Sequence, residues 1–461
     1  MFKRSYRYAL VAGAALLVPL VTATAASATW LAGAAGAAGT AGVAGRAASA
    51  RTAGAAGVAG ATGVAGATGA ARAAAYWRVA ASVQAKNRTI QLSDIAADAT
   101  NDAWAIGSAR VQGQASFQPV VEHWDGRGWH TVTLPGSVLA TLGTASARAT
   151  IGASSPANVW AFGMGGYWLH WNGTQWTAGR LARPAPGALG PYVGSPLVFG
   201  PDNVWAFGDY QTKAGALVPY GLHYNGRTWK SFTAPGMYGF AAESAVSPDD
   251  IWGLMNAGVS GSGDVLTRWD GSRWATKALP ATLTSSATLY SILARSDADV
   301  WVGGKSRKTG DGVVAHWDGS AWSIDTFQPV KDFPVDALVQ MVPDGKNGIW
   351  ALASCTLGSC WRLWHYTGGQ WQGPVQPAIN GVPATFVADI AEVPGSTAIW
   401  AAGGSSSGTV QGGMIALQGS VPAARKPAPA RKATPRPSYP PPARYYPPPA
   451  RPAAQCPPGT M

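Results

Sequence analysis

Histidine is the residue in this sequence with the clearest capacity for chemistry, and its positions follow a pattern. Five of the six histidines stand directly before an aromatic residue and three residues before a glycine: His123, His170, His223, His316 and His365. A metal or catalytic site needs different residues that converge on one point, whereas one copy in each unit of a repeat indicates a structural role. Arg268 takes the same place in a further unit, and the remaining histidine, His130, has no evident partner. We therefore expect no metal site and no cofactor.

A second set of polar residues stands about ten positions before a recurring tryptophan. These are Asp94, Thr150, Ser195, Ser291 and Gln340, with Glu243 and Asp389 one residue off this spacing. Each falls near the start of the innermost strand of its unit, so the set predicts a polar ring around a central channel. Concave channel mouths commonly bind ligands, which makes this ring our candidate binding site. The alternative is that these side chains only line a wet channel.

Carboxylates outside the repeated positions are the other candidates for catalysis. They are Glu122, Glu243, Glu392, Asp94, Asp209, Asp264 and Asp389. A glycosidase needs two carboxylates that face one bond, and the sequence does not establish that any two converge. We therefore expect a non-catalytic protein. A glycan-active hydrolase or lyase that uses Asp94 or Asp389 at the channel mouth is the alternative.

The tryptophans show which elements must position these residues. A tryptophan in a short apolar run recurs as Trp104, Trp160, Trp205, Trp252, Trp301, Trp350 and Trp400, at intervals of 56, 45, 47, 49, 49 and 50 residues. Seven units of about fifty residues have the size of propeller blades. We expect these tryptophans to pack between the blades.

A turn motif follows each of the first six tryptophans. It is exemplified by His123-Trp124-Asp125-Gly126, with a further tryptophan at position 129. Asp-Gly or Asn-Gly between aromatic residues predicts a tight hairpin. Each unit then supplies four antiparallel strands, so we predict an all-β fold, a seven-bladed β-propeller of four-stranded antiparallel blades.

The seventh unit lacks a Trp-led outer strand after Met414–Gly419. The segment Tyr76–Ala81, before the first unit, resembles the missing strand. Pairing the two ends of the domain in one blade would close the ring and remove exposed sheet edges.

The alternation of Val-Trp-Ala-x-Gly with His-Trp-Asp-Gly-x-x-Trp over residues 76–421 resembles the tryptophan-rich propeller repeats of secreted actinobacterial proteins. More distantly it resembles tectonin and kelch repeats. The resemblance implies the fold and says little about function, because unrelated activities share propellers. The Asp-Gly turns lack the Ser/Thr of the sialidase Asp-box, so no sialidase mechanism is carried over.

The segments outside the propeller predict export. Residues 1–28 have the three-part pattern of a signal peptide, residues 29–75 form a Gly/Ala-rich triplet spacer, and residues 422–461 form a basic Pro-rich tail. The glycine period leaves both a flexible spacer and a collagen-like trimer open. We expect no stable transmembrane span. Cys355 and Cys360 are predicted to form a disulfide, which leaves Cys456 over.

The net charge of +12 comes from the terminal segments, because the propeller region alone carries a net charge of −1. A nucleic-acid partner is therefore not expected. The leading hypothesis is a secreted, possibly wall-associated, binding or scaffolding propeller for a glycan or a cell-surface protein. Its tail would contact anionic wall polymers. A structural cell-wall protein is the second alternative.

Overall fold

The computed structural model describes most of the repeat region. The described residues are 77–84, 87–111, 117–142, 149–163, 165–184, 186, 192–194, 196–232, 234, 240–255, 264–326, 337–354, 361–375, 378–379, 382–383, 386–407 and 410–419. All of them belong to one compact unit, Met1–Ala424. The predicted signal peptide, spacer and tail lie outside the described residues, as do Ser195 and both Cys355 and Cys360.

The described strands form seven sheets that follow one another along the chain. The first three are β2 (Arg88–Ala99), β3 (Asp102–Val111), β4 (Phe117–Trp124) and β5 (Trp129–Thr131); β6 (Ala149–Ser155), β7 (Asn158–Gly163), β8 (Tyr167–Trp171) and β9 (Trp176–Arg180); and β10 (Tyr192–Val193), β11 (Leu197–Gly200), β12 (Asn203–Gln211), β13 (Leu217–Tyr224) and β14 (Trp229–Phe232). The next three are β15 (Phe240–Ser247), β16 (Asp250–Met255), β17 (Val265–Trp269) and β18 (Trp274–Lys277); β19 (Ala287–Ser296), β20 (Asp299–Ser306), β21 (Gly312–Trp317) and β22 (Trp322–Thr326); and β23 (Leu338–Pro343), β24 (Ile349–Ser354), β25 (Trp361–Thr367) and β26 (Gln370–Val375). The seventh sheet is β29 (Phe386–Glu392), β30 (Ile399–Ser407), β31 (Val410–Gln418) and β1 (Trp77–Val83).

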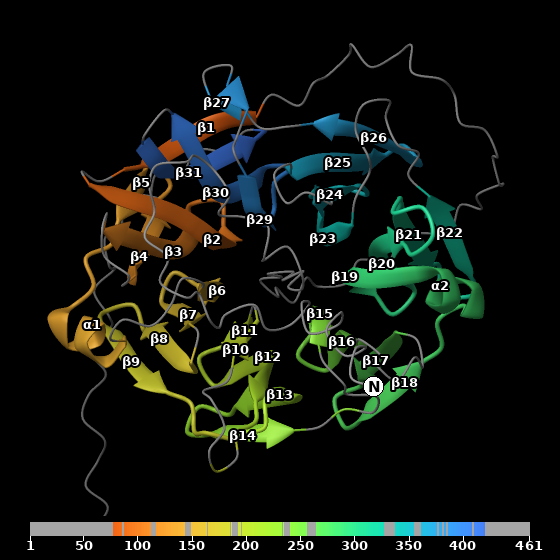
Figure 1. The fold of residues 1–461 in the computed structure, drawn as a ribbon, viewed down its shortest axis with the longest axis horizontal. Coiled ribbons are helices and arrows are strands. Elements are labelled where there is room, and N and C mark those ends of the chain that lie inside the picture. The colour runs from red at the N-terminus through yellow and green to blue at the C-terminus, as the bar shows by residue number, and fades with distance from the viewer. Residues whose placement is uncertain are drawn as a thin grey trace, which may run out of the picture. The chain divides into compact units, whose positions relative to one another are not determined.

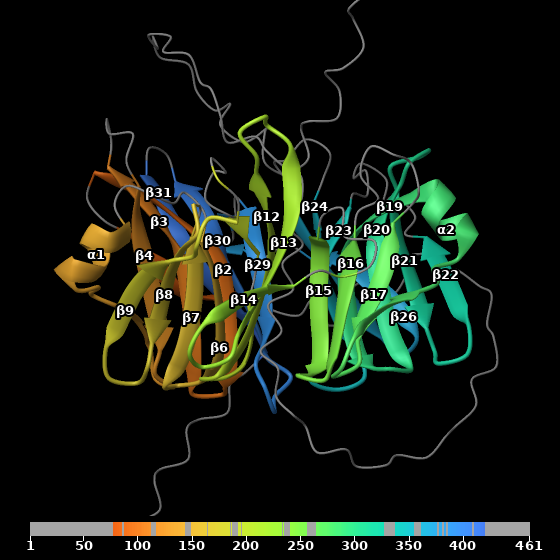
Figure 2. The same cartoon turned by 90° about the horizontal axis from the view of Figure 1, so that it is seen from below.

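These sheets are the seven blades of a β-propeller, as predicted (Figure 1). Within each blade consecutive strands are antiparallel, and the first strand lies innermost. The third blade differs because two short strands, β10 and β11, share the innermost place beside β12. Seen from the side, β12 and β13 extend beyond the neighbouring strands (Figure 2). A separate two-stranded pair is formed by β27 (Ala378–Ile379) and β28 (Val382–Pro383).

The ring closes through the seventh blade. β1 pairs antiparallel with β31, from Trp77 opposite Gln418 to Val83 opposite Gly413. The N-terminal strand of the propeller therefore completes the C-terminal blade, as the missing outer strand of the seventh unit predicted.

The hydrophobic core lies between the blades. Buried residues of the described chain form seven clusters, and each cluster draws its members from two adjacent blades. The repeated tryptophans lie in these layers: Trp104 meets Trp176 of the next blade edge-on with ring centroids 5.7 Å apart, and Trp400 meets Trp129 at 5.1 Å. The expectation that the tryptophans pack between blades is confirmed.

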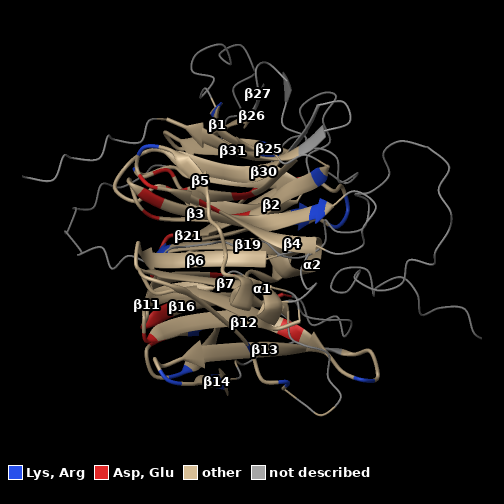
Figure 3. Ribbon diagram, turned by 90° about the vertical axis from the view of Figure 1, so that its left-hand side faces the viewer, with Lys and Arg blue, Asp and Glu red and all other residues tan. Residues whose placement is uncertain are grey.

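The Asp-Gly and Asn-Gly hairpins form because one side chain bonds the turn and glycine takes positive φ. In the fifth blade Asp318 Oδ1 accepts hydrogen bonds from the backbone N–H groups of Ser320 and Ala321, both at 2.8 Å. Gly319 has φ 93°, where a side chain is strained. Charged residues lie largely at such turns and strand ends (Figure 3).

Two short helices, which the sequence analysis did not predict, occupy connections between blades. They are α1 (Gly136–Leu142) and α2 (Ala281–Ser286). Val138 and Leu142 pack between the first and second blades, and Leu283 packs between the fourth and fifth. Within the described part of the chain, neither these nor any other helix is long and apolar enough to cross a membrane.

Candidate functional site

The predicted polar ring is present on the innermost strands, but it is closed to solvent. Asp94, Thr150, Glu243, Ser291, Gln340 and Asp389 are all at most 5% exposed. Ser195 lies outside the described residues. The six described residues therefore lie on the innermost strands, where they were predicted, but their side chains are buried and do not line an open channel.

Hydrogen bonds from these side chains run to the backbone of the next blade. Asp94 Oδ2 accepts from Ile151 N at 2.8 Å. Thr150 Oγ1 donates to Gly194 O at 3.0 Å. Each innermost strand is the edge of its sheet, so its free N–H and C=O groups need such partners when buried.

The same pattern continues through the fifth, sixth and seventh blades. Ser291 Oγ donates to Leu338 O at 3.0 Å. Gln340 bonds Ile390 twice, donating from Nε2 to O at 2.9 Å and accepting at Oε1 from N at 3.0 Å. We call the polar residues Asp94, Thr150, Ser244, Ser291, Gln340 and Asp389 the inter-blade belt.

Asp389 closes the belt between the last blade and the first, because its Oδ2 accepts from Ile95 N at 3.0 Å. In the fourth blade the bridging residue is Ser244, whose Oγ accepts from Ala294 N at 2.9 Å. Ser244 lies opposite Trp252, so it stands two residues beyond the register that the other belt residues share. The predicted residue, Glu243, lies between these two positions.

A longer connection in the seventh blade explains why Asp389 stands eleven residues before its tryptophan instead of ten. Trp400 lies opposite Ala391, nine residues earlier, whereas Trp104 lies opposite Ala96, eight residues earlier. The strand register shifts between Val387 and Asp389, so Asp389 lies opposite Ala402, two residues after Trp400. Asp94 follows a similar shift and lies opposite Ile106, two residues after Trp104. In the fourth blade the residue in this register is Ala242.

Burial raises the pKa of two carboxyl groups of the ring. Burial, and then the nearby charge of Asp94, raises the pKa of Glu243 well above its usual value. The same two causes raise the pKa of Asp389, which also forms a side-chain hydrogen bond with Asp94. Within the described part of the chain, Glu243 Oε1 and Asp389 Oδ1 have no hydrogen-bond partner. The ring thus favours the neutral form of these two acids.

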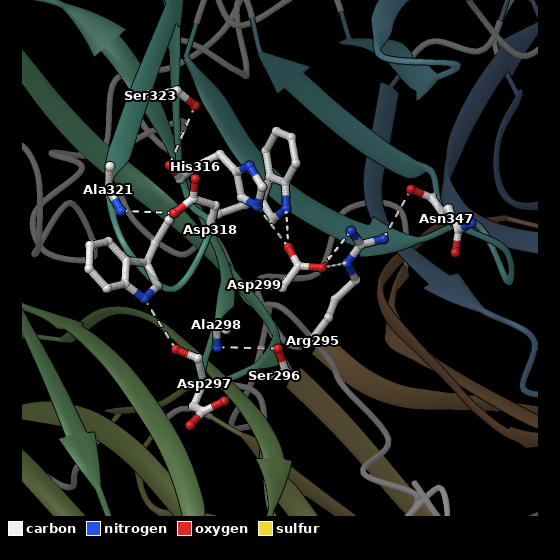
Figure 4. Close-up of polar contacts among 12 residues, drawn as sticks. Arg295, Ser296, Asp297, Ala298, Asp299, His316, Asp318, Ala321, Ser323 and Asn347 are labelled. Atoms are coloured by element: carbon white, nitrogen blue, oxygen red, sulfur yellow. Dashed lines mark hydrogen bonds and ion pairs between the residues drawn. The ribbon is translucent and has the colours of Figure 1, made fainter. Parts of the chain in front are cut away.

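The repeated histidines belong to a second structural device. In the fifth blade Asp299 accepts from Trp301 Nε1 at 2.7 Å and from His316 Nε2 at 2.9 Å, and the two rings stack with centroids 3.9 Å apart (Figure 4). Arg295 also binds Asp299 and donates to Asn347 O of the next blade at 3.1 Å.

Four other blades build the same stack, the fourth blade replaces the histidine by arginine, and in the seventh blade Leu417 lies opposite Trp400. His123, His170, His223 and His365 stack on Trp104, Trp160, Trp205 and Trp350 with centroids 3.9–4.2 Å apart. In the fourth blade the Arg268 guanidinium lies 5.2 Å from the Trp252 ring centroid and binds Asp250. These histidines therefore orient core tryptophans. Among the described residues no group of three or more His, Cys, Asp or Glu is placed to hold a metal ion.

An aromatic hollow between the third and fourth blades is the feature that the repeat does not explain. Its volume is about 670 Å³, within the range of ligand sites. We call it the blade 3–4 groove, and its described lining is Trp205, His223, Lys230, Ser231, Phe232, Ala234, Trp269, Arg273 and Trp274.

One residue of the lining is smaller than its counterparts in three other blades. Five residues after the first tryptophan of the outer strand, the first, second and fourth blades carry Leu134, Leu181 and Leu279, which pack into the inter-blade core. The third blade carries Ala234 at this position, and Ala234 lines the groove. The sequence has Phe327, Gln376 and Ser82 at this position in the remaining blades.

The walls of the groove are fixed by aromatic packing. Phe232 and Trp274, one from each blade, are stacked at 5.6 Å, and Trp205 contacts Trp269 at 5.4 Å. Trp205 is only 5% exposed, and its Nε1 donates to Asn203 Oδ1 at 2.9 Å. The site is thus preformed on strands.

The polar part of the lining is cationic. Lys230 and Arg273 are exposed, and no Asp or Glu belongs to the described lining. Burial, and then the charge of Lys230, lowers the pKa of His223, which keeps that imidazole neutral at pH 7. The groove was not predicted from the sequence, because its cationic and small lining residues are departures from the repeat and not part of it.

Comparison with known proteins gives no family for this chain. No family model and no curated protein matches it. Its structure is similar to that of Ycf48 bound to a D1 peptide, with 16% identity, a TM-score of 0.47, and coverage of 73% of this chain and 94% of that one.

Two further solved structures are similar at the same level. The fucose-specific lectin from Aleuria aurantia has 15% identity, a TM-score of 0.41, and coverage of 66% of this chain and 100% of that one. A puromycin-hydrolyzing peptidase from Mycobacterium tuberculosis has 12% identity, a TM-score of 0.46, and coverage of 68% and 49%. Function therefore has to be argued from the residues of this chain.

Proposed function

We propose that this propeller is a non-catalytic binding module outside the bacterial cell, and that it holds a glycan in the blade 3–4 groove. The observation that carries the proposal is the aromatic hollow itself, with Trp205, Phe232, Trp269 and Trp274 in its lining. A sugar ring has apolar C–H faces and polar edges, so it fits a site built of aromatic surfaces and a few polar groups.

The rigidity of the groove supports a binding role. Trp205 is held by Asn203 and by stacking on His223 at 4.2 Å, so the floor of the site does not need to reorganise for a ligand. A preformed site loses little conformational entropy when it binds.

A non-catalytic role is supported by the use of the residues that carry chemistry. Asp94 and Asp389 bond the backbone of neighbouring blades, and five histidines stack on core tryptophans. The proposal of export, with display at the cell surface through the spacer and basic tail, rests on the terminal sequences.

The test is an array of glycans, cell-wall polymers and peptides probed with the full chain. Ala234→Leu introduces the side chain that three other blades carry and should occupy the part of the groove beside Ala234. Ala321→Leu adds the same atoms to an exposed turn of the fifth blade and is the matched control.

We expect the wild type and Ala321→Leu to bind the same glycans, and Ala234→Leu to lose at least tenfold in affinity. Equal binding by Ala234→Leu would place the ligand elsewhere. Cleavage of a bound glycan would contradict the non-catalytic role.

A further inference from the structure

Resting on the proposed function, we infer that the blade 3–4 groove selects an anionic glycan, one whose sugar carries a carboxylate or a phosphate. Lys230 of β14 and Arg273, directly before β18, come from different blades and line the same aromatic hollow. The negative group would pair with these two cations while the sugar ring lies on the aromatic surface.

Lys230 and Arg273 occupy two equivalent positions that can be compared at every junction, that is, wherever one blade packs against the next. The first position is the residue directly after the first outer-strand tryptophan of one blade. The second is the residue directly before the first outer-strand tryptophan of the next blade. Starting at the first junction these pairs are His130 and Gln175, Thr177 and Thr228, Lys230 and Arg273, Ala275 and Ala321, Ser323 and Gln370, Gln372 and Tyr76, and Arg78 and Gly128. Only at the third junction are both positions occupied by Lys or Arg, and the blade 3–4 groove lies at this junction.

Both cations are available to a ligand. Arg273 has one acidic neighbour, Asp270, with Nε 3.6 Å from Oδ2, and both side chains are largely exposed. An exposed ion pair of this kind is weak, so a ligand anion can compete with it. Hydrogen bonds from a guanidinium to carboxylate or phosphate are strong and geometrically specific.

The negative charge of Asp270 repels an anionic ligand. An asparagine at the equivalent turn of another blade shows which substitution can remove this charge. Asp270 Oδ1 accepts from Ser272 N and Arg273 N, both at 2.9 Å, and so forms the turn. Asn225 forms the corresponding turn in the third blade through its own Oδ1. Asp270→Asn should therefore keep the turn and remove the charge.

The test compares one sugar in charged and neutral form. Full-length protein is titrated by calorimetry with oligogalacturonate and its fully methyl-esterified form, and with galactose 6-phosphate and galactose. We expect oligogalacturonate or galactose 6-phosphate to bind at least tenfold more tightly than its neutral counterpart. The two charged ligands distinguish a carboxylate from a phosphate.

Variants assign the effect to the groove. Lys230→Gln and Arg273→Gln should each weaken the preferred anionic ligand about five- to tenfold and weaken the neutral ligand clearly less. Lys308→Gln, at an exposed turn of the fifth blade, should have no effect, and Asp270→Asn should strengthen anionic binding several-fold.

Three results would overturn the inference in different ways. Equal affinity for the charged and neutral forms, unchanged by Lys230→Gln and Arg273→Gln, would refute anion selection and leave glycan binding intact. Binding of no glycan at all would refute the proposed function as well. Tighter binding of poly-glutamate than of any glycan would make the ligand an acidic peptide.

Discussion

Replacing Gln340 by methionine should weaken the propeller because Gln340 joins the sixth blade to the seventh. Its amide makes two hydrogen bonds to Ile390, at 2.9 and 3.0 Å, and the side chain is 2% exposed. Methionine has a similar length and volume but cannot form these bonds. A buried N–H and a buried C=O would then lose their partners, at about 1–3 kcal/mol each.

We therefore expect Gln340→Met to lower the free energy of unfolding by about 2–6 kcal/mol, measured by urea denaturation. Gln372→Met, on the exposed surface of β26, is the control and should stay within about 0.5 kcal/mol of the wild type. If Gln340→Met were as stable as this control, the belt would not hold the blades together.

Three further predictions concern the stack, a buried acid and the groove. Asp299→Ala should lower the free energy of unfolding, measured by thermal unfolding, by about 2–4 kcal/mol because Trp301 and His316 lose their shared acceptor. Asp299→Asn imitates Asn203 of the third blade and should lower the free energy of unfolding by less than half as much. Burial raises the pKa of Asp209 from 3.8 to about 6, so the folded state keeps a proton that the unfolded state loses, and stability should fall as pH rises from about 4 to about 6. Asp209→Asn should flatten that part of the pH profile in urea denaturation, and an unchanged slope would contradict the assignment. Ala234→Leu should raise thermal stability by about 0.5–2 kcal/mol, as cavity-filling substitutions do, and a loss of stability would mean that the groove cannot accept the side chain.

The architecture could be predicted from sequence because each blade repeats the same physical solution. A tryptophan, an Asp-Gly or Asn-Gly hairpin and a Trp-led outer strand recur, so an error in one unit is corrected by the others. The departure of the seventh unit was equally informative. Because the sequence after β31 lacks an outer strand, β31 was expected to pair with the strand at the start of the propeller, which is β1.

The functional surface could be predicted less well. The positions of the polar ring followed from register, but sequence spacing could not distinguish an open channel from a belt that bonds sheet edges. Between paired residues, the connection from β29 to β30 is one residue longer than its counterpart in the first blade, and this length moved Asp389 off the common spacing. The groove depends on how side chains of two blades meet around Ala234, and the spacing of residues along the chain does not give that packing.

The most direct measurement is the affinity of one bound glycan for the wild type, Ala234→Leu and Gln340→Met, determined by calorimetry at a temperature where all three are folded. We predict that Ala234→Leu loses at least tenfold in affinity while Gln340→Met binds like the wild type, because the groove holds the ligand and the belt holds the fold. The opposite result, with affinity lost in Gln340→Met and retained in Ala234→Leu, would place the ligand at the central ring and contradict a binding site between the third and fourth blades.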